Sequence, residues 1–154
     1  MRPELYFDKI KMMKEYFSLS KNEKQKINEK IKKSLLEQKE VVFAFVFGSF
    51  LNSPSFRDVD IGVYAKNINK EKFFDYELGL SKKISEALNL PFSIIEIKIL
   101  NFAPSSFLNN IFKNGELLFS KDDQILSDLI EKTSLDALAN AHISYQSLKE
   151  LVPA

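Results

Sequence analysis

The sequence predicts an α/β or α+β domain in which helices cover a small sheet. Short hydrophobic runs rich in β-branched and aromatic residues, typical of buried strands, recur along the chain. Segments with apolar residues at helical spacing lie between them. The length of 154 residues, with 45% hydrophobic and 28% charged residues, is that of one ordinary globular domain. Strands interleaved with helices therefore indicate a sheet packed against helices.

The beginning of the chain predicts two helices, which together occupy residues 3–39. Residues 3–17 carry apolar side chains at roughly helical spacing. A capping box over residues 20–23, with the serine and glutamate that this motif requires, begins the second helix. The second helix places its apolar side chains on one stripe and its lysines and glutamates on the other side. The stripe consists of Ile27, Ile31 and Leu35.

Three hydrophobic segments predict the strands of the sheet. Val41–Phe47 is short and rich in Val and Phe, so we expect a central strand covered on both faces. Residues 58–65 are flanked by turn residues and predict a second strand. Residues 92–100 alternate and predict a third strand, with Glu96 in the middle of an isoleucine run. A helix is expected over residues 70–89, between the second and third strands.

The remainder of the chain predicts a short helix, an edge strand and a long helix. The short helix covers 105–113 and ends near Gly115, where we expect a left-handed glycine. Residues 116–119 predict the edge strand, and 122–150 the long C-terminal helix. Apolar residues of the long helix roughly keep helical spacing: Ile125, Leu129, Leu135, Leu138, Ala141, Tyr145 and Leu148.

Several classes of protein are disfavoured by composition. No repeat or flexible linker interrupts the chain, so we predict a single domain over 1–154 with a core of about 41–119. The absence of cysteine excludes disulfides, thiolate metal sites and cysteine nucleophiles. A net charge of +1 argues against a protein that coats nucleic acid. No membrane span or signal peptide is recognisable, so we expect a soluble cytoplasmic protein.

Two aspartates bracket one valine at the head of the second predicted strand. Side chains in a strand repeat every two residues, so Asp58 and Asp60 are expected on the same face. Two adjacent carboxylates repel each other unless a cation lies between them. Oxygen ligands of this kind suit Mg²⁺ or Mn²⁺, which leave their remaining positions to water and substrate phosphates.

A Gly-Ser turn supplies the complementary half of the predicted site. Gly48 lets backbone N–H groups approach an anion closely, and the Ser49 hydroxyl adds a donor. Glu96 becomes a third carboxylate if the second and third strands are neighbours. Two metals held by three carboxylates would stabilise both the attacking and the leaving oxygen of a phosphoryl or nucleotidyl transfer.

With these residues the chain resembles the nucleotidyltransferases of the DNA polymerase β superfamily, and more narrowly the minimal nucleotidyltransferases (MNT). The resemblance covers about residues 41–119, including the segment NFAPSSFLNNIFKNGELLFS. It implies an α+β nucleotidyltransferase fold, a small mixed sheet covered by helices. In that family the Gly-Ser turn binds the nucleoside triphosphate and the first two acidic residues bind metal. The third acidic residue binds metal or helps to deprotonate the acceptor.

Carried over to this chain, the resemblance assigns triphosphate binding to Gly48 and Ser49. It assigns metal binding and catalysis to Asp58, Asp60 and Glu96. Two departures from the family pattern stand out. The eight residues between Ser49 and Asp58 make a shorter loop than is usual, and the third acid is a glutamate where aspartate is commoner. Either departure is consistent with weakened catalysis.

Plainer interpretations exist for several of these residues. Asp58 and Asp60 could form a solvated strand end, and Glu96 could face solvent beside Lys98. Arg57 is more simply an exposed loop residue than a phosphate ligand. His142 is interpreted as a packed or interface residue, because a lone histidine in a helix is more often structural than catalytic.

The resemblance implies a metal-dependent transfer of NMP, AMP from ATP, to an acceptor hydroxyl. It also implies a partner, since MNT proteins often act as antitoxins that adenylylate a HEPN-domain toxin. The alternative is a catalytically weak or dead MNT-like binding module that neutralises or scaffolds a partner through its terminal helices. A nucleic-acid-tailing enzyme is disfavoured by the near-zero net charge. A homo-oligomer formed by the terminal helices stays open.

Overall fold

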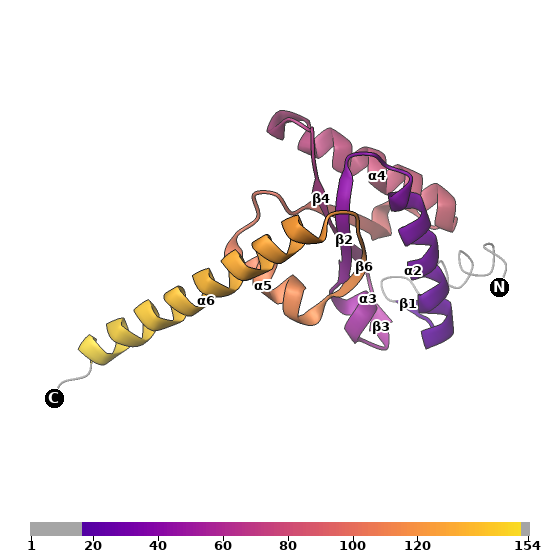
Figure 1. Ribbon diagram of the computed structural model, residues 1–154. Helices are drawn as coiled ribbons and strands as arrows, with labels where there is room; N and C mark the ends of the chain where they lie inside the picture. The colour runs from indigo at the N-terminus through magenta and orange to yellow at the C-terminus, as the bar shows by residue number, and fades with distance from the viewer. Residues whose placement is uncertain (1–16, 152–154) are drawn as a thin grey trace.

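The computed structural model of the protein describes residues 17–151 (Figure 1). No helix in this part of the chain is both long and apolar enough to cross a membrane. The elements follow in the order β1 (Phe17–Ser18), α2 (Lys21–Leu36), β2 (Val41–Phe47), α3 (Ser49–Asn52), β3 (Ser55–Phe56), β4 (Val59–Ala65), η1 (Lys70–Lys72), α4 (Phe73–Leu88), η2 (Phe92–Ile94), β5 (Ile95–Ile99), α5 (Ser105–Asn114), β6 (Glu116–Ser120) and α6 (Asp123–Leu151).

The main sheet has four strands in the order β5-β4-β2-β6. The central strand β2 pairs antiparallel with both β4 and β6, whereas β4 and β5 run parallel. The expected α+β fold with a small mixed sheet is thereby confirmed. The antiparallel pairs bring the carboxyl end of β2 beside the amino end of β4, and the parallel pair brings the amino end of β5 to the same place.

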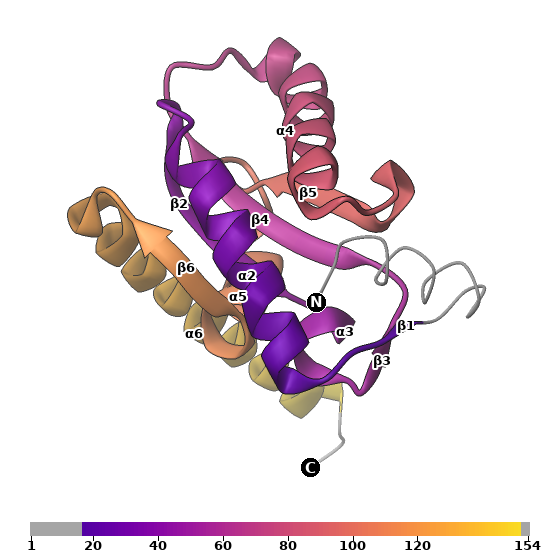
Figure 2. The ribbon, with the colours of Figure 1, turned by 90° about the vertical axis from the view of Figure 1, so that its right-hand side faces the viewer.

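Each face of the sheet is covered by different helices, as Figures 1 and 2 show. Strand residues alternate between the faces, because successive side chains point to opposite sides. One face packs against α2 and α4, whose buried residues include Ile31 and Ile84. The opposite face packs against α5 and the first turns of α6, through residues such as Phe45 and Ile111. Asp60 and Glu96 belong to this second face, called here the α5 face.

The segment between β2 and β4 is folded tightly. Strand β3 pairs with β1 in a separate two-stranded sheet. The Phe50 and Phe56 side chains are almost fully buried, with ring centroids 4.9 Å apart in an edge-to-face arrangement. The ammonium of Lys24 lies over both rings and donates a hydrogen bond of 2.6 Å to the carbonyl of Ser53. The short loop is thus anchored by its own aromatic side chains.

Most predicted elements are confirmed, including the capping serine of α2, whose hydroxyl accepts from the Glu23 N–H. Two details were wrong. The third strand begins only at Ile95, because the residues after Pro91 form a 3₁₀ turn. Gly115 is extended rather than left-handed, and it is glycine because a Cβ there would lie 2.6 Å from the carbonyl oxygen of Ile111. The helix predicted over 3–17 lies outside the described residues, apart from its last residue in β1.

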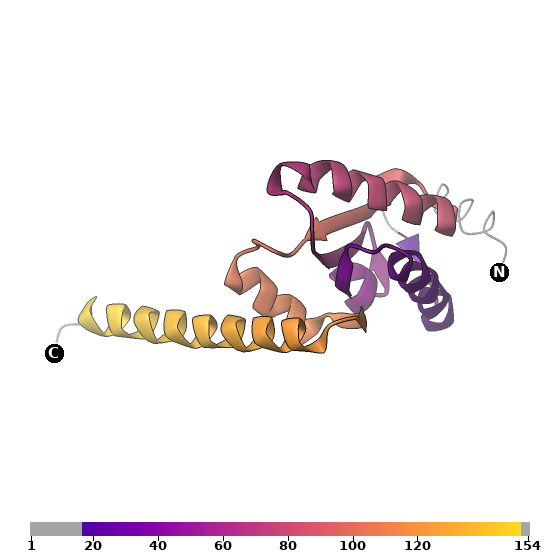
Figure 3. The ribbon, with the colours of Figure 1, turned by 45° about the horizontal axis from the view of Figure 1, so that its top comes forward.

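Helix α6 is packed over its first half and projects from the domain over its second, as Figure 3 shows. Thr133 is buried, and Asp136 accepts a hydrogen bond of 2.8 Å from the Ser105 hydroxyl of α5. Every residue of 138–150 is exposed. The apolar stripe predicted for this helix is therefore only partly buried. Its exposed members are Leu135, Leu138, Ala141, Tyr145 and Leu148.

Candidate functional site

The candidate site is a row of side chains across three neighbouring strands. Phe47 at the end of β2 pairs with Asp60 near the start of β4, and Asp60 pairs with Glu96 on β5. Residues paired in register on adjacent strands present their side chains to the same face, with strands about 4.8 Å apart. Asp60 and Glu96 thus lie side by side on the α5 face, in a cavity of about 200 Å³ called here the carboxylate cavity. Its lining consists of Phe47, Asp60, Glu96, Lys98 and Phe107.

Asp60 is the electrostatic centre of this cavity. Four causes together raise the pKa of Asp60 to about 7: burial, which is the largest, a hydrogen bond with Glu96, and the negative charges of Glu96 and of Asp58. Near neutral pH the Asp60 carboxyl can therefore hold a proton, which a bound cation would replace.

Asp58 lies one residue before β4 and does not line the carboxylate cavity. Its charge nevertheless acts on Asp60. Among residues 17–151, no three His, Cys, Asp or Glu side chains are grouped so that they could hold a metal by themselves. Mg²⁺ is commonly held by only one or two carboxylates together with substrate phosphates, so the donor set fits a metal that arrives with a nucleotide.

Gly48 connects the end of β2 to α3 directly beside Asp60. Its backbone has φ of 80° and ψ of −159°, a region that is essentially restricted to glycine. A Cβ at this position would overlap the Oδ2 atom of Asp60. Glycine is therefore required twice, by the backbone turn and by the carboxylate that occupies the space of a side chain. Ser49, the next residue, is exposed at the start of α3.

Replacing Gly48 by alanine is expected to destabilise the protein by about 1–3 kcal/mol, because the new methyl group meets both constraints. Urea denaturation of the purified variant measures this change. Gly79→Ala is the matched control, since Gly79 lies in α4 and an added Cβ there meets nothing within 4 Å. This control should gain about 0.5–1 kcal/mol from helix propensity. Equal effects of the two substitutions would contradict the role of Gly48.

Two further cavities adjoin the carboxylate cavity at opposite ends. An amide cavity of about 270 Å³ shares Phe47 with it and is lined by Phe47, Gly48, Asn52, Asn110 and Asn114. An aromatic cavity of about 400 Å³ shares Lys98 and Phe107 with it, and its other lining residues are Lys70, Phe73, Ile99, Phe102, Ala103 and Pro104. The three cavities share these lining residues and are together called here the trough, in which the carboxylates lie between the Gly48 turn and the aromatic side chains.

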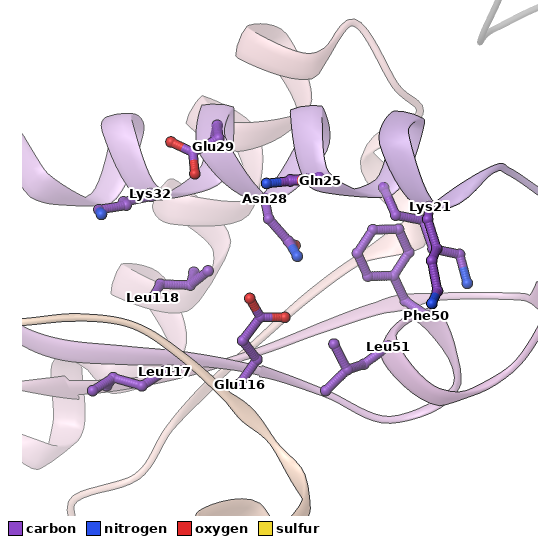
Figure 4. A pocket seen from close by; sticks show the side chains of 11 residues that line it. Lys21, Gln25, Asn28, Glu29, Lys32, Phe50, Leu51, Glu116, Leu117 and Leu118 are labelled. Carbon is purple, nitrogen blue, oxygen red and sulfur yellow. The ribbon is translucent and has the colours of Figure 1, made fainter.

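A cavity of about 440 Å³ lies away from the carboxylates, between α2, α3 and β6 (Figure 4). Figure 4 shows Asn28 and Glu116 pointing into it from opposite walls. The buried Oδ1 atom of Asn28 lacks a hydrogen-bond partner among the described residues. This cavity is larger than the carboxylate cavity, but Asp60 and Glu96 lie in the latter, which is therefore the candidate site.

The structure places the predicted residues unequally. Asp60, Glu96 and Gly48 come together, whereas Asp58 and Ser49 flank them. Glu96 is exposed and lines the same cavity as Lys98, as expected if Glu96 faces solvent beside Lys98. Arg57 and His142 are exposed, and the packed interpretation of His142 is wrong.

Sequence reasoning missed the contributions of the loop after β5 and of α5 to this trough. The clearest missed residue is Phe102, which is 69% exposed and lines the aromatic cavity. An exposed phenylalanine cannot be distinguished from a core phenylalanine in a chain with 14 of them. Lys98, which the alternation of the strand places beside Glu96, lines both the carboxylate and the aromatic cavity.

Comparison with known proteins gives a family and a set of related folds. A sequence model described as "Polymerase beta, Nucleotidyltransferase" matches residues 29–124. No curated protein matches the chain significantly. The tri-AMPylated Shewanella oneidensis HEPN toxin in complex with its MNT antitoxin has a similar chain, with a TM-score of 0.57 and 20% identity over 85% of this chain and 99% of that one.

Two further solved structures are similar. The toxin–antitoxin MntA–HepT contains a chain with a TM-score of 0.55 and 20% identity, covering 84% of this chain and 99% of that chain. A toxin–antitoxin with AMP-PNP contains a chain with a TM-score of 0.58 and 21% identity, covering 82% and 98%. At these identities the likeness establishes a shared fold.

Proposed function

Because the chain belongs to the polymerase β nucleotidyltransferase family, we propose that it transfers NMP, AMP from ATP, to a hydroxyl group of a partner protein. One observation carries this proposal: Gly48 lacks the Cβ that would collide with Asp60, and Asp60 is in register with Glu96. A phosphate-binding turn and a carboxylate pair thus meet at one point. A solvated strand end would require neither the glycine nor the register.

The proposed reaction forms one bond and breaks one. The acceptor oxygen attacks the α-phosphorus, the bond between that phosphorus and the α,β-bridging oxygen breaks, and pyrophosphate leaves. The Gly48–Ser49 turn holds the β- and γ-phosphates through backbone N–H groups and the serine hydroxyl. Glu96 receives the acceptor proton, since its side chain is exposed within the carboxylate cavity.

Asp58 and Asp60 are the residues that would hold a divalent cation, Mg²⁺ or Mn²⁺. Such a cation supplies charge neutralisation between carboxylates and phosphates. The raised pKa of Asp60 supports this assignment, because a cation relieves the same repulsion that a proton relieves.

The partner is proposed to be a HEPN-domain toxin, with this chain as its antitoxin. Two of the related structures are complexes of an MNT or MntA protein with a HEPN or HepT toxin. The projecting half of α6 supports a protein partner here, since Leu138, Ala141, Tyr145 and Leu148 follow the 3-4-3 spacing of a helix-packing seam. None of the residues 17–135 covers that seam.

The second candidate function is that of a binding module without catalysis. The observation that favours it is the failure of the three predicted carboxylates to gather: Asp58 lies outside the carboxylate cavity and Glu96 is exposed. In that case the projecting half of α6 would neutralise the toxin by binding alone. The short segment between Ser49 and Asp58 would then only anchor α3.

Transfer of label separates the two functions. The protein, Mg²⁺ or Mn²⁺, α-labelled ATP and the cognate HEPN-type toxin are incubated together, and label on the toxin and complex formation are measured in parallel. We expect transfer by the wild type and loss of transfer in Asp58→Ala/Asp60→Ala, with unchanged complex formation. If no label transfers with either metal while the double variant binds the toxin normally, the protein is a binding module. Complex formation is followed by size-exclusion chromatography with light scattering, which also detects a homodimer.

A further inference from the structure

The aromatic cavity lies on the far side of the carboxylates from the Gly48 turn. Lys98 pairs with Gly62, two residues further along both β4 and β5 than the pair formed by Asp60 and Glu96. Because β2 runs antiparallel to β4, this direction leads away from Gly48. A triphosphate that reaches from Gly48 to the carboxylates therefore has its nucleoside end directed toward Lys98 and the cavity beyond it.

The loop that carries Phe102 is held firmly. Asn101 clamps the end of β4, accepting from the Ala65 N–H at 3.0 Å and donating to the Ala65 carbonyl at 2.6 Å. The Leu100 N–H donates to Val63 at 2.8 Å, and the Ala103 N–H closes a turn onto Leu100 at 3.2 Å. The Phe102 ring is thus 69% exposed although the backbone on both sides of it is held by hydrogen bonds.

The surroundings of Phe102 are aromatic and positively charged. The ring of Phe73 stacks beside it, with centroids 5.9 Å apart and planes inclined by 24°. The Lys70 ammonium lies 5.1 Å from the Phe102 ring centroid. Lys98 and Phe107 complete the passage to the carboxylate cavity. Aromatic faces bordered by cations are suited to bind a planar base that carries phosphates.

We propose that the aromatic cavity receives the nucleobase of the triphosphate and binds it by stacking on Phe102, without reading its identity. This inference rests on the proposed nucleotidyl transfer. The polar side chains among the lining residues are Lys70 and Lys98, which are donors only. No lining side chain can accept a hydrogen bond from the amino group that distinguishes adenine. The site therefore favours the larger purines over pyrimidines and separates ATP from GTP by less than about tenfold.

Equilibrium binding tests the inference without any acceptor. The full-length protein is titrated calorimetrically with the α,β-methylene analogues of ATP, GTP, CTP and UTP in the presence of Mg²⁺, because this linkage cannot be cleaved at the reacting bond. We expect the Phe102→Ala variant to bind the ATP analogue about tenfold more weakly, the loss of one base–aromatic stack. Phe102→Tyr, which keeps the aromatic face, should bind as the wild type does.

Phe74→Ala is the matched control, since Phe74 is also 69% exposed but lies outside the cavity. Its affinity should stay within twofold of the wild type. Inorganic tripolyphosphate should bind equally to the wild type and to Phe102→Ala, because its phosphates lie at the Gly48 turn. Equal nucleotide affinity of Phe102→Ala and the wild type overturns the inference, as does a preference for ATP over GTP above about 100-fold. Failure of every nucleotide to bind the wild type would instead overturn the proposed function.

If Phe102→Ala binds nucleotide normally but transfers AMP more slowly to the toxin, the cavity belongs to the acceptor, and the base assignment is wrong. If tripolyphosphate is weakened as strongly as the nucleotides, the loss comes from the phosphate end, and the stacking argument is also wrong. Circular dichroism spectra of the variants verify that each is folded, which is expected because Phe102 and Phe74 are both largely exposed.

Discussion

Replacing Asp60 by asparagine is expected to lower nucleotidyl transfer by about 10²–10³-fold while making the metal-free protein more stable above pH 7. Activity falls because the variant lacks the carboxylate that lies between the Gly48 turn and Glu96. Stability rises because the same carboxylate is partly buried among negative charges. Opposite effects on activity and stability identify a residue retained for function.

The sign of the pH dependence follows from the two pKa values of Asp60, its usual 3.8 and about 7 in the folded protein. Below pH 3.8 the carboxyl is protonated in both the folded and the unfolded state and costs nothing. Between pH 3.8 and 7 the unfolded state ionises first, so the free energy of unfolding decreases as pH rises. Above pH 7 the cost is complete and constant. Because Asp60 is only half-buried, water screens part of this electrostatic cost. We expect the free energy of unfolding to fall by about 1–2 kcal/mol in total.

Urea denaturation in EDTA at pH 4 and pH 8 measures this effect. The variant Asp60→Asn should equal the wild type at pH 4 and exceed it at pH 8. Glu131→Gln, which changes an exposed carboxylate on α6, serves as the control and should show no such difference. A variant that is less stable than the wild type at pH 8 would contradict the described electrostatics of Asp60.

Replacing Phe50 by alanine is expected to cost about 3–5 kcal/mol of the free energy of unfolding. The Phe50 side chain is fully buried and packs edge-to-face on Phe56, and both rings lie beneath the Lys24 ammonium. Removal leaves a cavity under α3 that these neighbours cannot fill. The free energy of unfolding of a small domain is only about 5–15 kcal/mol, so this one substitution removes a large share of the stability.

Urea denaturation measures the loss, with Phe74→Ala as the control that should stay within about 0.5 kcal/mol. Because Phe50 follows Ser49 directly, nucleotide binding should weaken in the Phe50 variant even under conditions where it is folded. A loss below about 1 kcal/mol would show that α3 is not anchored by this ring.

Local pattern and chemistry were sufficient to predict most of the fold. Val41–Phe47 was predicted with the bounds that it has, because a short run of Val and Phe fits a strand covered on both faces. The pairing of Asp60 with Glu96 was expected only on the condition that their strands are neighbours. The parallel pairing of β4 with β5 meets that condition, and this long-range contact cannot be read from local periodicity.

The reasons for Gly48 and Gly115 were hidden from the sequence. Gly48 was interpreted as a close approach to an anion, and the structure adds that the anion nearest to it is Asp60 itself. Gly115 was expected to be left-handed, whereas close packing against Ile111 requires it. Both requirements for glycine depend on the atoms that the fold places next to it, the Asp60 carboxylate at Gly48 and the Ile111 carbonyl at Gly115. The aromatic cavity was missed for a similar reason, since its residues come from η1, α4, β5, the loop after β5, and α5.

The two halves of α6 are expected to unfold separately, the first with the whole domain and the second on its own. Up to Asp136 the helix shares side-chain contacts with α5, so its amide protons should exchange with solvent only when the whole domain opens. Beyond Ala137 the helix has only its own backbone hydrogen bonds, and an isolated stretch of this length is marginal in water. We expect this half to fray and reform independently of the sheet. We therefore expect a partner that binds this half to stabilise its helicity and its protection from exchange, so that binding would complete the folding of the helix.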